Sequence, residues 1–214
     1  MACSWLRAMA LKVMPMVKLA KIKSSNTKTR KDVIIAKAAR LFREKGYSAT
    51  SMRDLAEHVG VEAASLYNHI RSKSEILQEI CFNTANRFMN QISEVEASNQ
   101  RSIEKIEAIL QFHIRQIVES YEEVYVMDRE WKHLTDPYLS NMQSQRRSYR
   151  QRIAAIIEEG IRKGEIKSID APTAVLIILH AVSGIESWHR SVKRISAEML
   201  EDNMVMILVD GLRK

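Results

Sequence analysis

Very few residues in this sequence can interrupt a helix. Its 214 residues include only 6 glycines and 3 prolines. Leu, Ile, Ala, Glu, Lys and Arg dominate, and no stretch shows the alternation of β-branched and polar residues that strands need. The 46% hydrophobic content is sufficient to fill a core. We therefore expect an all-α fold with a packed interior.

The spacing of apolar residues predicts about nine helices. Four of them fall within residues 31–96, where Gly46 and Gly60 end the first two and capping boxes at Ser51 and Ser72 open later ones. Five more are expected over residues 103–118, 121–134, 138–161, 173–188 and 199–212. The chain then divides into a basic, flexible extension (1–30), a three-helix domain (31–75) and a larger helical domain (76–214).

The excess of positive over negative charge is confined to one part of the chain. The net charge is +7, and residues 1–80 hold 15 Lys and Arg against 7 Asp and Glu, an excess of +8. Lys and Arg neutralise phosphates and release condensed counterions, so this third of the chain is expected to contact a polyanion. A merely solvated basic surface is the alternative.

Several classes of protein are excluded by missing motifs. There is no Gly-rich phosphate loop, no nucleophile elbow and no Glu-x-x-His pair, so we expect neither an enzyme nor a cofactor. Cys3 and Cys81 lack the spacing of a disulfide framework or a metal site, which fits a reducing cytoplasm. No apolar run reaches the length of a membrane span. Lys12 and Pro15 interrupt the apolar residues 1–15, so no targeting signal is expected, and Met14 or Met16 is an alternative start.

Residues 51–70 have the layout of a helix-turn-helix unit. A short helix, a turn containing Gly60 and a second short helix follow one another, and Ala56 is small where the two helices cross. In such units the second helix enters the major groove of DNA.

Motifs across residues 31 to about 80 resemble the N-terminal signature of the TetR family of transcriptional regulators. They are Ala39-Arg40-Leu41-Phe42, Gly46-Tyr47, Thr50-Ser51, Asp54-Leu55-Ala56, Gly60-Val61, Leu66-Tyr67-Asn68-His69-Ile70 and Ser72-Lys73. The resemblance implies a homodimer that binds a palindromic operator on double-stranded DNA, usually as a repressor, and is released by a small-molecule effector. Residues 76–214 are then the ligand-binding and dimerisation domain. The alternative is a non-specific architectural or adaptor protein without a ligand switch.

The resemblance also implies the residues that contact DNA. Those expected to read bases are Arg53, Ala63, Ala64, Ser65 and Asn68, and those expected at phosphates or beside them are Thr50, Ser51, Tyr67, His69 and Lys73. The chemistry agrees, because Arg pairs with guanine, Asn with adenine, and Ala contacts thymine methyls. Alternatives are packing for Tyr67, a Glu57 partner for Arg53 and simple exposure for His69. Lys28, Arg30 and Lys31 either extend into the minor groove or form a solvated tail.

The segment 173–185 is apolar on nearly all sides and carries small residues at Ala174, Ala181, Ser183 and Gly184. A subunit interface explains this pattern, and an ordinary core helix is the alternative. The family resemblance implies a four-helix bundle between protomers, in which a second apolar stripe is supplied by Met199, Leu200, Met204, Ile207 and Leu208.

Aromatic and polar residues of the larger domain are candidates for lining an effector pocket, although such stripes are more often core. They are Phe88, Phe112, His113, Tyr125, Met127, Glu130, Trp131, Met142, Tyr149, His180 and Trp188. Residues 149–164 and 184–188 resemble regulators of fatty-acid or aromatic degradation, which implies an acyl coenzyme A effector. Its phosphates would contact Arg146, Arg147, Arg150 and Arg152, unless these arginines are solvated or pair with Glu158 and Glu159.

Overall fold

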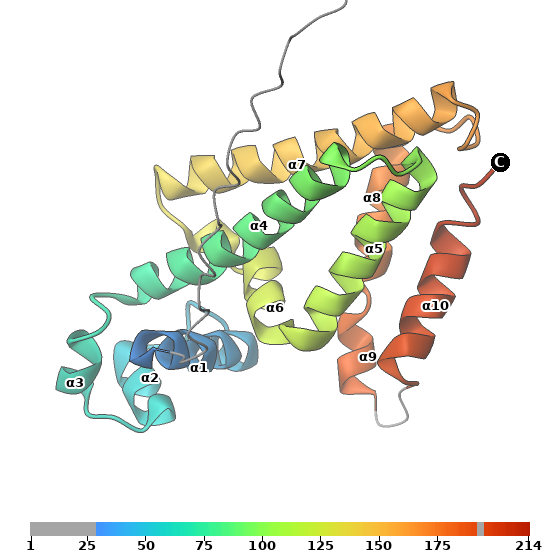
Figure 1. Cartoon of the computed structure of the whole chain (residues 1–214). Coiled ribbons are helices and arrows are strands. Elements are labelled where there is room, and N and C mark those ends of the chain that lie inside the picture. Colours follow the sequence, from blue (N-terminus) through green and yellow to red (C-terminus); the bar gives the residue numbers. More distant parts are fainter. Residues whose placement is uncertain (1–28, 192–194) are drawn as a thin grey trace, which may run out of the picture.

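The computed structural model describes residues 29–191 and 195–214 as helices joined by short connections (Figure 1). Its elements are α1 (Arg30–Lys45), α2 (Met52–Val59), α3 (Ala63–Tyr67), α4 (Lys73–Ala97), α5 (Ser102–Glu119), α6 (Tyr121–Arg129), the 3₁₀ helix η1 (Trp131–His133), α7 (Tyr138–Arg162), α8 (Ala171–Ser183), α9 (Glu186–Arg190) and α10 (Ala197–Leu208). The expected all-α fold is confirmed. The expected extension over residues 1–30 lies almost wholly outside the described residues.

Local signals set the ends of the first helices. The hydroxyl of Ser51 accepts a hydrogen bond from the backbone N–H of Asp54, which completes the capping box that opens α2. Gly46 and Gly60 follow α1 and α2 with φ of 83° and 80°, a backbone conformation that glycine adopts without a steric penalty. The sequence placed these boundaries because each depends on neighbouring residues only.

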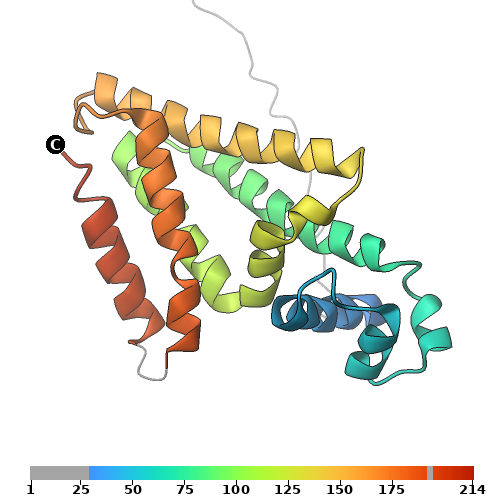
Figure 2. The same ribbon diagram turned by 180° about the vertical axis from the view of Figure 1, so that it is seen from behind.

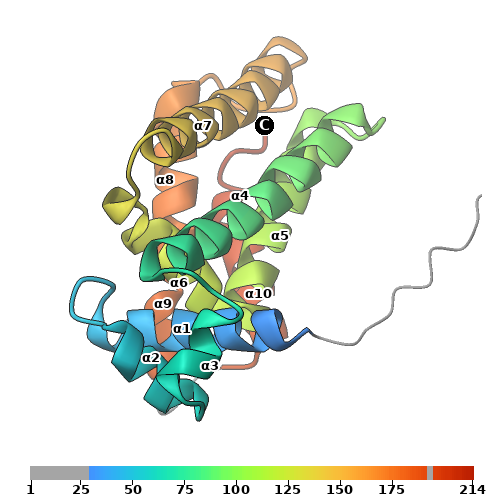
Figure 3. The same ribbon diagram turned by 90° about the vertical axis from the view of Figure 1, so that its left-hand side faces the viewer.

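The long helix α4 connects the two ends of the molecule. It begins beside α1–α3 and runs across to α5 and α7 (Figures 1 and 3). Its first half supplies Ile76, Leu77, Ile80 and Cys81 to a core that also contains the buried side chains of α1, α2 and α3. Val126 of α6 belongs to the same core, and α6 packs against both α1 and α4.

A second core fills the far half of the molecule, where α5, α7 and α8 pack together. Gly160 lets α7 approach the start of α5, since a Cβ there would lie 2.5 Å from Ile166 Cδ1 and 2.9 Å from Ser102 Cβ. Two expected helices are divided: the one over 121–134 becomes α6 and η1, and the one over 173–188 becomes α8 and α9. The tenth α-helix arises from this second division.

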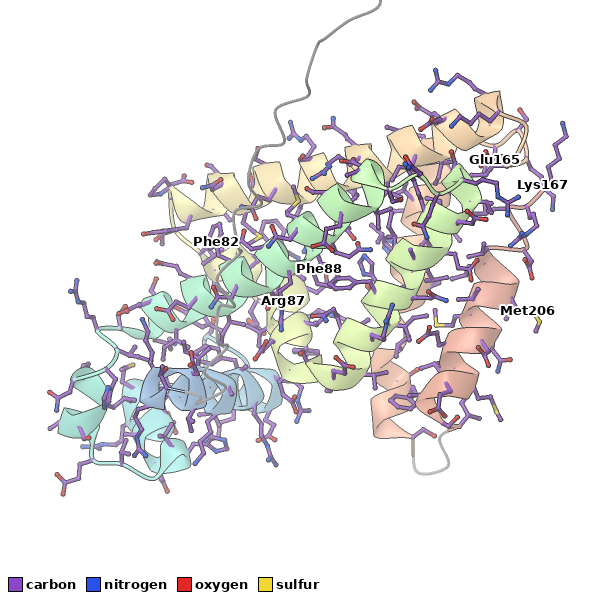
Figure 4. All side chains as sticks on the ribbon, viewed as in Figure 1. Phe82, Arg87, Phe88, Glu165, Lys167 and Met206 are labelled. Atoms are coloured by element: carbon purple, nitrogen blue, oxygen red, sulfur yellow. The ribbon has the colours of Figure 1, made fainter. Side chains whose placement is uncertain are left out.

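The last helices leave an apolar face uncovered. α8 and α10 lie at the end of the molecule remote from α3 (Figure 2). The exposed fractions are 55% for Leu176, 56% for Ile177, 52% for Met199, 60% for Met206 and 70% for Ile207. Met206 points away from the rest of the molecule (Figure 4). We call these five residues the C-terminal apolar face.

Candidate nucleic-acid interface and ligand cavity

The short helix α3 presents a compact set of exposed side chains. Leu66 is fully buried and anchors the helix on the first core, whereas its neighbours face solvent. The exposed residues on α3 and just after it are Ala63, Ala64, Ser65, Tyr67, Asn68 and His69. All six are sequence-predicted DNA contacts, and the structure brings them together at one corner of the molecule.

Arg53 and Ser51 lie at the start of α2. Arg53 is exposed, and no ion pair with Glu57 is found among the described residues. Ser51 is the N-cap, and its hydroxyl and backbone N–H both donate to Asp54 Oδ2. These bonds and the nearby Lys45 ammonium lower the pKa of Asp54 to about 2. The capping carboxylate therefore stays ionised at neutral pH.

Three residues expected at phosphates or in the groove bind other groups of the protein in this structure. Thr50 is only 1% exposed and its hydroxyl donates to Gly46 O at 2.8 Å, so it stabilises the turn before α2. Lys73 Nζ donates to Tyr47 O at 2.8 Å and to Thr50 O at 2.7 Å, and lies 4.4 Å from the centre of the Tyr47 ring. Lys31 is bound by Glu75 and Glu79, and Lys28 lies outside the described residues. Sequence spacing could not reveal the partners of Lys73 and Lys31, because these come from other elements.

A cavity of about 610 Å³ lies between α4, α5, α6, α7 and α8. Among the predicted residues, Phe88, Tyr125, Trp131, Tyr149 and His180 line it, as do His113 and Met127. Helical neighbours of these residues complete the walls and were missed by the sequence reasoning: they include Met89, Ile117, Val124, Gln145, Leu179 and Val182. For Ile117, Val124 and Gln145 the signal is their spacing of three or four residues from His113, Met127 and Tyr149 on the same helices.

The other predicted pocket residues do not line this cavity. Phe112 packs edge-to-face on Phe88 with 5.3 Å between ring centres and borders a separate hollow between α4 and α5. Glu130 Oε2 lies 3.3 Å from His133 Nε2. Trp188 Nε1 donates to Ile195 O at 2.9 Å, and Met142 is fully buried in the first core.

The interior of the cavity contains a neutral hydrogen-bonded pair. His113 Nε2 lies 2.8 Å from the Tyr149 hydroxyl. Burial lowers the pKa of His113 to about 4, opposed by the charge of Asp128, and burial raises the pKa of Tyr149. At neutral pH both side chains are therefore uncharged.

The arginines of α7 serve different purposes. Arg146 Nη2 lies 3.0 Å from Asp128 Oδ1, and its guanidinium lies 5.2 Å from the centre of the Trp131 ring. Arg152 Nε donates to Glu96 Oε1 at 2.9 Å. Neither pairs with the expected Glu158 or Glu159 within residues 29–191.

Positive charge also lies at the rim of the cavity. Arg150 and Lys132 are exposed lining residues, and neither forms an ion pair with another described residue. No group of three His, Cys, Asp or Glu side chains that could hold a metal ion occurs in the part of the chain that the structure describes. The arrangement therefore offers an apolar chamber with a neutral polar pair inside and cations at its edge.

The chain matches two family models that together span most of its length. Residues 34–80 match the bacterial regulatory proteins of the tetR family, and residues 99–212 match the tetracyclin repressor-like C-terminal domain.

Individual relatives match almost end to end. The HTH-type transcriptional repressor KstR2 of Rhodococcus jostii is 27% identical over 194 residues, covering 88% of this chain and 94% of that protein. The ketosteroid regulator KstR2 of Mycobacterium tuberculosis has a similar fold, with a TM-score of 0.81 at 21% identity, over 88% of this chain and 97% of that one. AibR in complex with isovaleryl coenzyme A and operator DNA gives a TM-score of 0.74 at 25% identity, over 85% of this chain and 98% of that one.

Proposed function

Because the chain belongs to the TetR family of bacterial regulatory proteins, we propose that it is a homodimeric repressor released from a palindromic operator by a small-molecule effector. The observation that carries this proposal is the combination of an exposed α3 face with a large cavity, joined through one continuous set of helices. The chain is a transcriptional regulator and not an enzyme.

On the DNA side, α3 enters the major groove. Ala63, Ala64, Ser65 and Asn68 face base edges, and Arg53 reaches them from α2. Tyr67 and His69 contact phosphates, while Ser51 holds the start of α2 in place. Lys73 and Thr50 support this surface from behind, since their polar atoms are bound to backbone carbonyls.

The C-terminal apolar face is the dimer interface. The segment Ala171–Trp188 is long and apolar enough to cross a membrane, yet only 33% of it is buried in one protomer and it is divided between α8 and α9. A second protomer packed on α8 and α10 covers this surface without a bilayer. Two-fold symmetry then places the two α3 helices roughly 34–36 Å apart, one turn of DNA. We propose that the dimer acts on DNA in the cytoplasm.

The effector is an amphiphile with an apolar body and an anionic end, and an acyl coenzyme A thioester has this chemistry. Phe88, Ile117 and Leu179 provide apolar walls, and Arg150 and Lys132 lie at the rim where phosphates can bind. The structure of AibR with isovaleryl coenzyme A supports this ligand class for a protein of similar fold.

Helix α6 connects the cavity to the DNA-binding helices. Tyr121 lines the cavity from the first turn of α6, and its ring centre lies 5.4 Å from the Arg43 guanidinium of α1. A ligand that moves Tyr121 therefore acts on α1 directly. Release requires that the ligand bind the non-operator conformation more tightly than the operator-bound one.

Two measurements test the proposal. Binding to DNA from upstream of its own gene, compared with shuffled DNA of equal composition at one fixed salt concentration, gives the specificity ratio. We expect a ratio of at least about 1,000, and a ratio near one would favour the non-specific architectural alternative. Thermal melts with acyl coenzyme A esters should show stabilisation that rises with ligand concentration, whereas free coenzyme A should give less.

A further inference from the structure

Besides charged residues such as Asp128, Arg146 and Glu186, the cavity lining includes three neighbouring uncharged polar side chains on α5 and α7. His113 and Tyr149 are hydrogen-bonded to each other at 2.8 Å, and Phe88 packs against His113 with 4.6 Å between ring centres. Gln145 lies one helical turn before Tyr149 and lines the same cavity. An acyl chain entering this chamber therefore meets a polar patch beside apolar side chains such as Phe88 and Ile117.

Gln145 has unused hydrogen-bonding capacity in this patch. Its Oε1 atom is buried and has no hydrogen-bond partner among the described residues. A buried acceptor without a partner costs free energy, and a ligand that donates to it once the amide turns toward the cavity removes that cost. The cationic side chains of the cavity, in contrast, are either paired, as Arg146 is with Asp128, or exposed to solvent, as Arg150 is.

The His113–Tyr149 pair can also bind one more group. A phenol hydroxyl both donates and accepts, and a neutral imidazole has one donor and one acceptor nitrogen. If Tyr149 donates to His113, its oxygen accepts from a ligand; if His113 donates to Tyr149, the Tyr149 hydroxyl donates to a ligand. The pair is uncharged at neutral pH, so it offers no counter-ion to a carboxylate.

We propose that His113, Tyr149 and Gln145 form a polar subsite that selects effectors whose apolar body carries an uncharged hydroxyl or keto oxygen. This inference rests on the proposed function, because it specifies the acyl group of the coenzyme A thioester that releases the operator. A hydroxyl group satisfies the subsite more fully than a keto group, since it donates to Gln145 Oε1 as well as accepting. A saturated acyl chain leaves all three side chains without a ligand partner.

The test compares octanoyl coenzyme A with its 3-, 5- and 7-hydroxy derivatives, the matching keto derivatives, and the thioester of the same length that ends in a carboxylate. Release of the full-length protein from a labelled fragment of its upstream DNA is followed by fluorescence anisotropy. We expect at least one hydroxy derivative to release DNA at a concentration about tenfold lower than octanoyl coenzyme A. The carboxylate-ended thioester should be weaker than that derivative.

Tyr149→Phe removes the hydroxyl and keeps the ring, and Gln145→Met removes the amide oxygen at similar volume. Each variant should reduce the hydroxyl advantage to about twofold or less while the response to octanoyl coenzyme A changes little. Tyr138→Phe is the matched control, because Tyr138 is on the same helix, is 42% exposed and does not line the cavity. The advantage should persist in that variant.

The outcomes separate the two proposals. If octanoyl coenzyme A and its derivatives release DNA equally well, or if the hydroxyl advantage survives in both Tyr149→Phe and Gln145→Met, the polar subsite is refuted and the effector class stands. If no thioester in the set releases DNA from a protein that binds it specifically, the effector class is refuted and the subsite with it.

Discussion

Replacing Ile207 by Asp should convert the dimer into monomers at micromolar concentration. Ile207 is 70% exposed in the protomer and is the most exposed large apolar residue of the C-terminal apolar face. Its neighbour Met206 is 60% exposed, so the substitution falls beside another exposed apolar side chain.

The magnitude follows from the exposed fraction. Fully burying an Ile side chain is worth about 1.5–3 kcal/mol, so covering 70% of Ile207 contributes roughly 1–2 kcal/mol in each protomer. A two-fold interface uses the same residue twice, which gives about 2–4 kcal/mol per dimer. At about 1.4 kcal/mol per decade, the dissociation constant rises roughly 30- to 1,000-fold. A buried unpaired carboxylate adds to this loss, so the estimate is a lower bound.

Sedimentation velocity over a concentration series measures the effect, and circular dichroism verifies that the helices remain. Ile169→Asp is the matched control, because Ile169 is 37% exposed but lies in the connection between α7 and α8. The reasoning is refuted if Ile207→Asp dimerises like the unaltered protein, or if Ile169→Asp dissociates to the same extent.

Three further predictions concern other parts of the molecule. Tyr67→Ala should weaken binding to all DNA sequences, whereas Arg53→Ala should relax the preference at one base pair. Binding to a set of single-base operator variants measures both effects. Equal effects of the two substitutions on all variants would contradict the assigned roles. Lys73→Met removes the ammonium group that donates to two backbone carbonyls within 2.8 Å. In urea titrations the free energy of unfolding should fall by about 1–3 kcal/mol. Arg71→Met, at an exposed position, is the control and should change the free energy of unfolding little. The pKa of His113 is about 4 in the folded protein against 6.5 ordinarily, so the unfolded chain binds the extra proton first as the pH falls. The free energy of unfolding should therefore decrease between about pH 6.5 and pH 4. His113→Gln should flatten this part of the plot of Tm against pH, and an unchanged slope would show that His113 is not buried in its neutral form.

The helix-turn-helix unit was predictable from sequence because its signals are local. Ser51 and Asp54 cap the helix that they begin, and Gly60 ends it, so no distant contact is needed to place these boundaries. Thr50 and Lys73 were assigned to phosphates because they match a motif, and that assignment stays a prediction. In the structure both side chains bind backbone carbonyls of the turn around Gly46 and Tyr47, and for Lys73 only the folded chain brings these carbonyls close.

The residues of the ligand cavity were predictable only in part. Helical spacing predicts that a side chain faces the interior, but it does not predict which side chains of other helices pack against it. Phe88 and Phe112 have similar patterns, yet Phe88 lines the cavity and Phe112 packs behind it. Likewise the partner of Arg152 is Glu96, which lies 56 residues earlier in the chain, rather than a glutamate of its own helix. Pairings of this kind depend on how helices cross.

The core shared by α1–α3 and the first half of α4 limits how this regulator can be recombined with its relatives. A chimera joined at residue 75 would separate Leu66 from Ile76, Leu77 and Ile80, and would leave apolar surface of both parents facing mismatched partners. A graft of new DNA specificity should therefore carry α4 at least as far as Ala85. The complementary surface of α6 around Val126 must be matched to it, because that side chain closes the same core. In this fold the exchangeable unit is larger than the segment that contacts DNA.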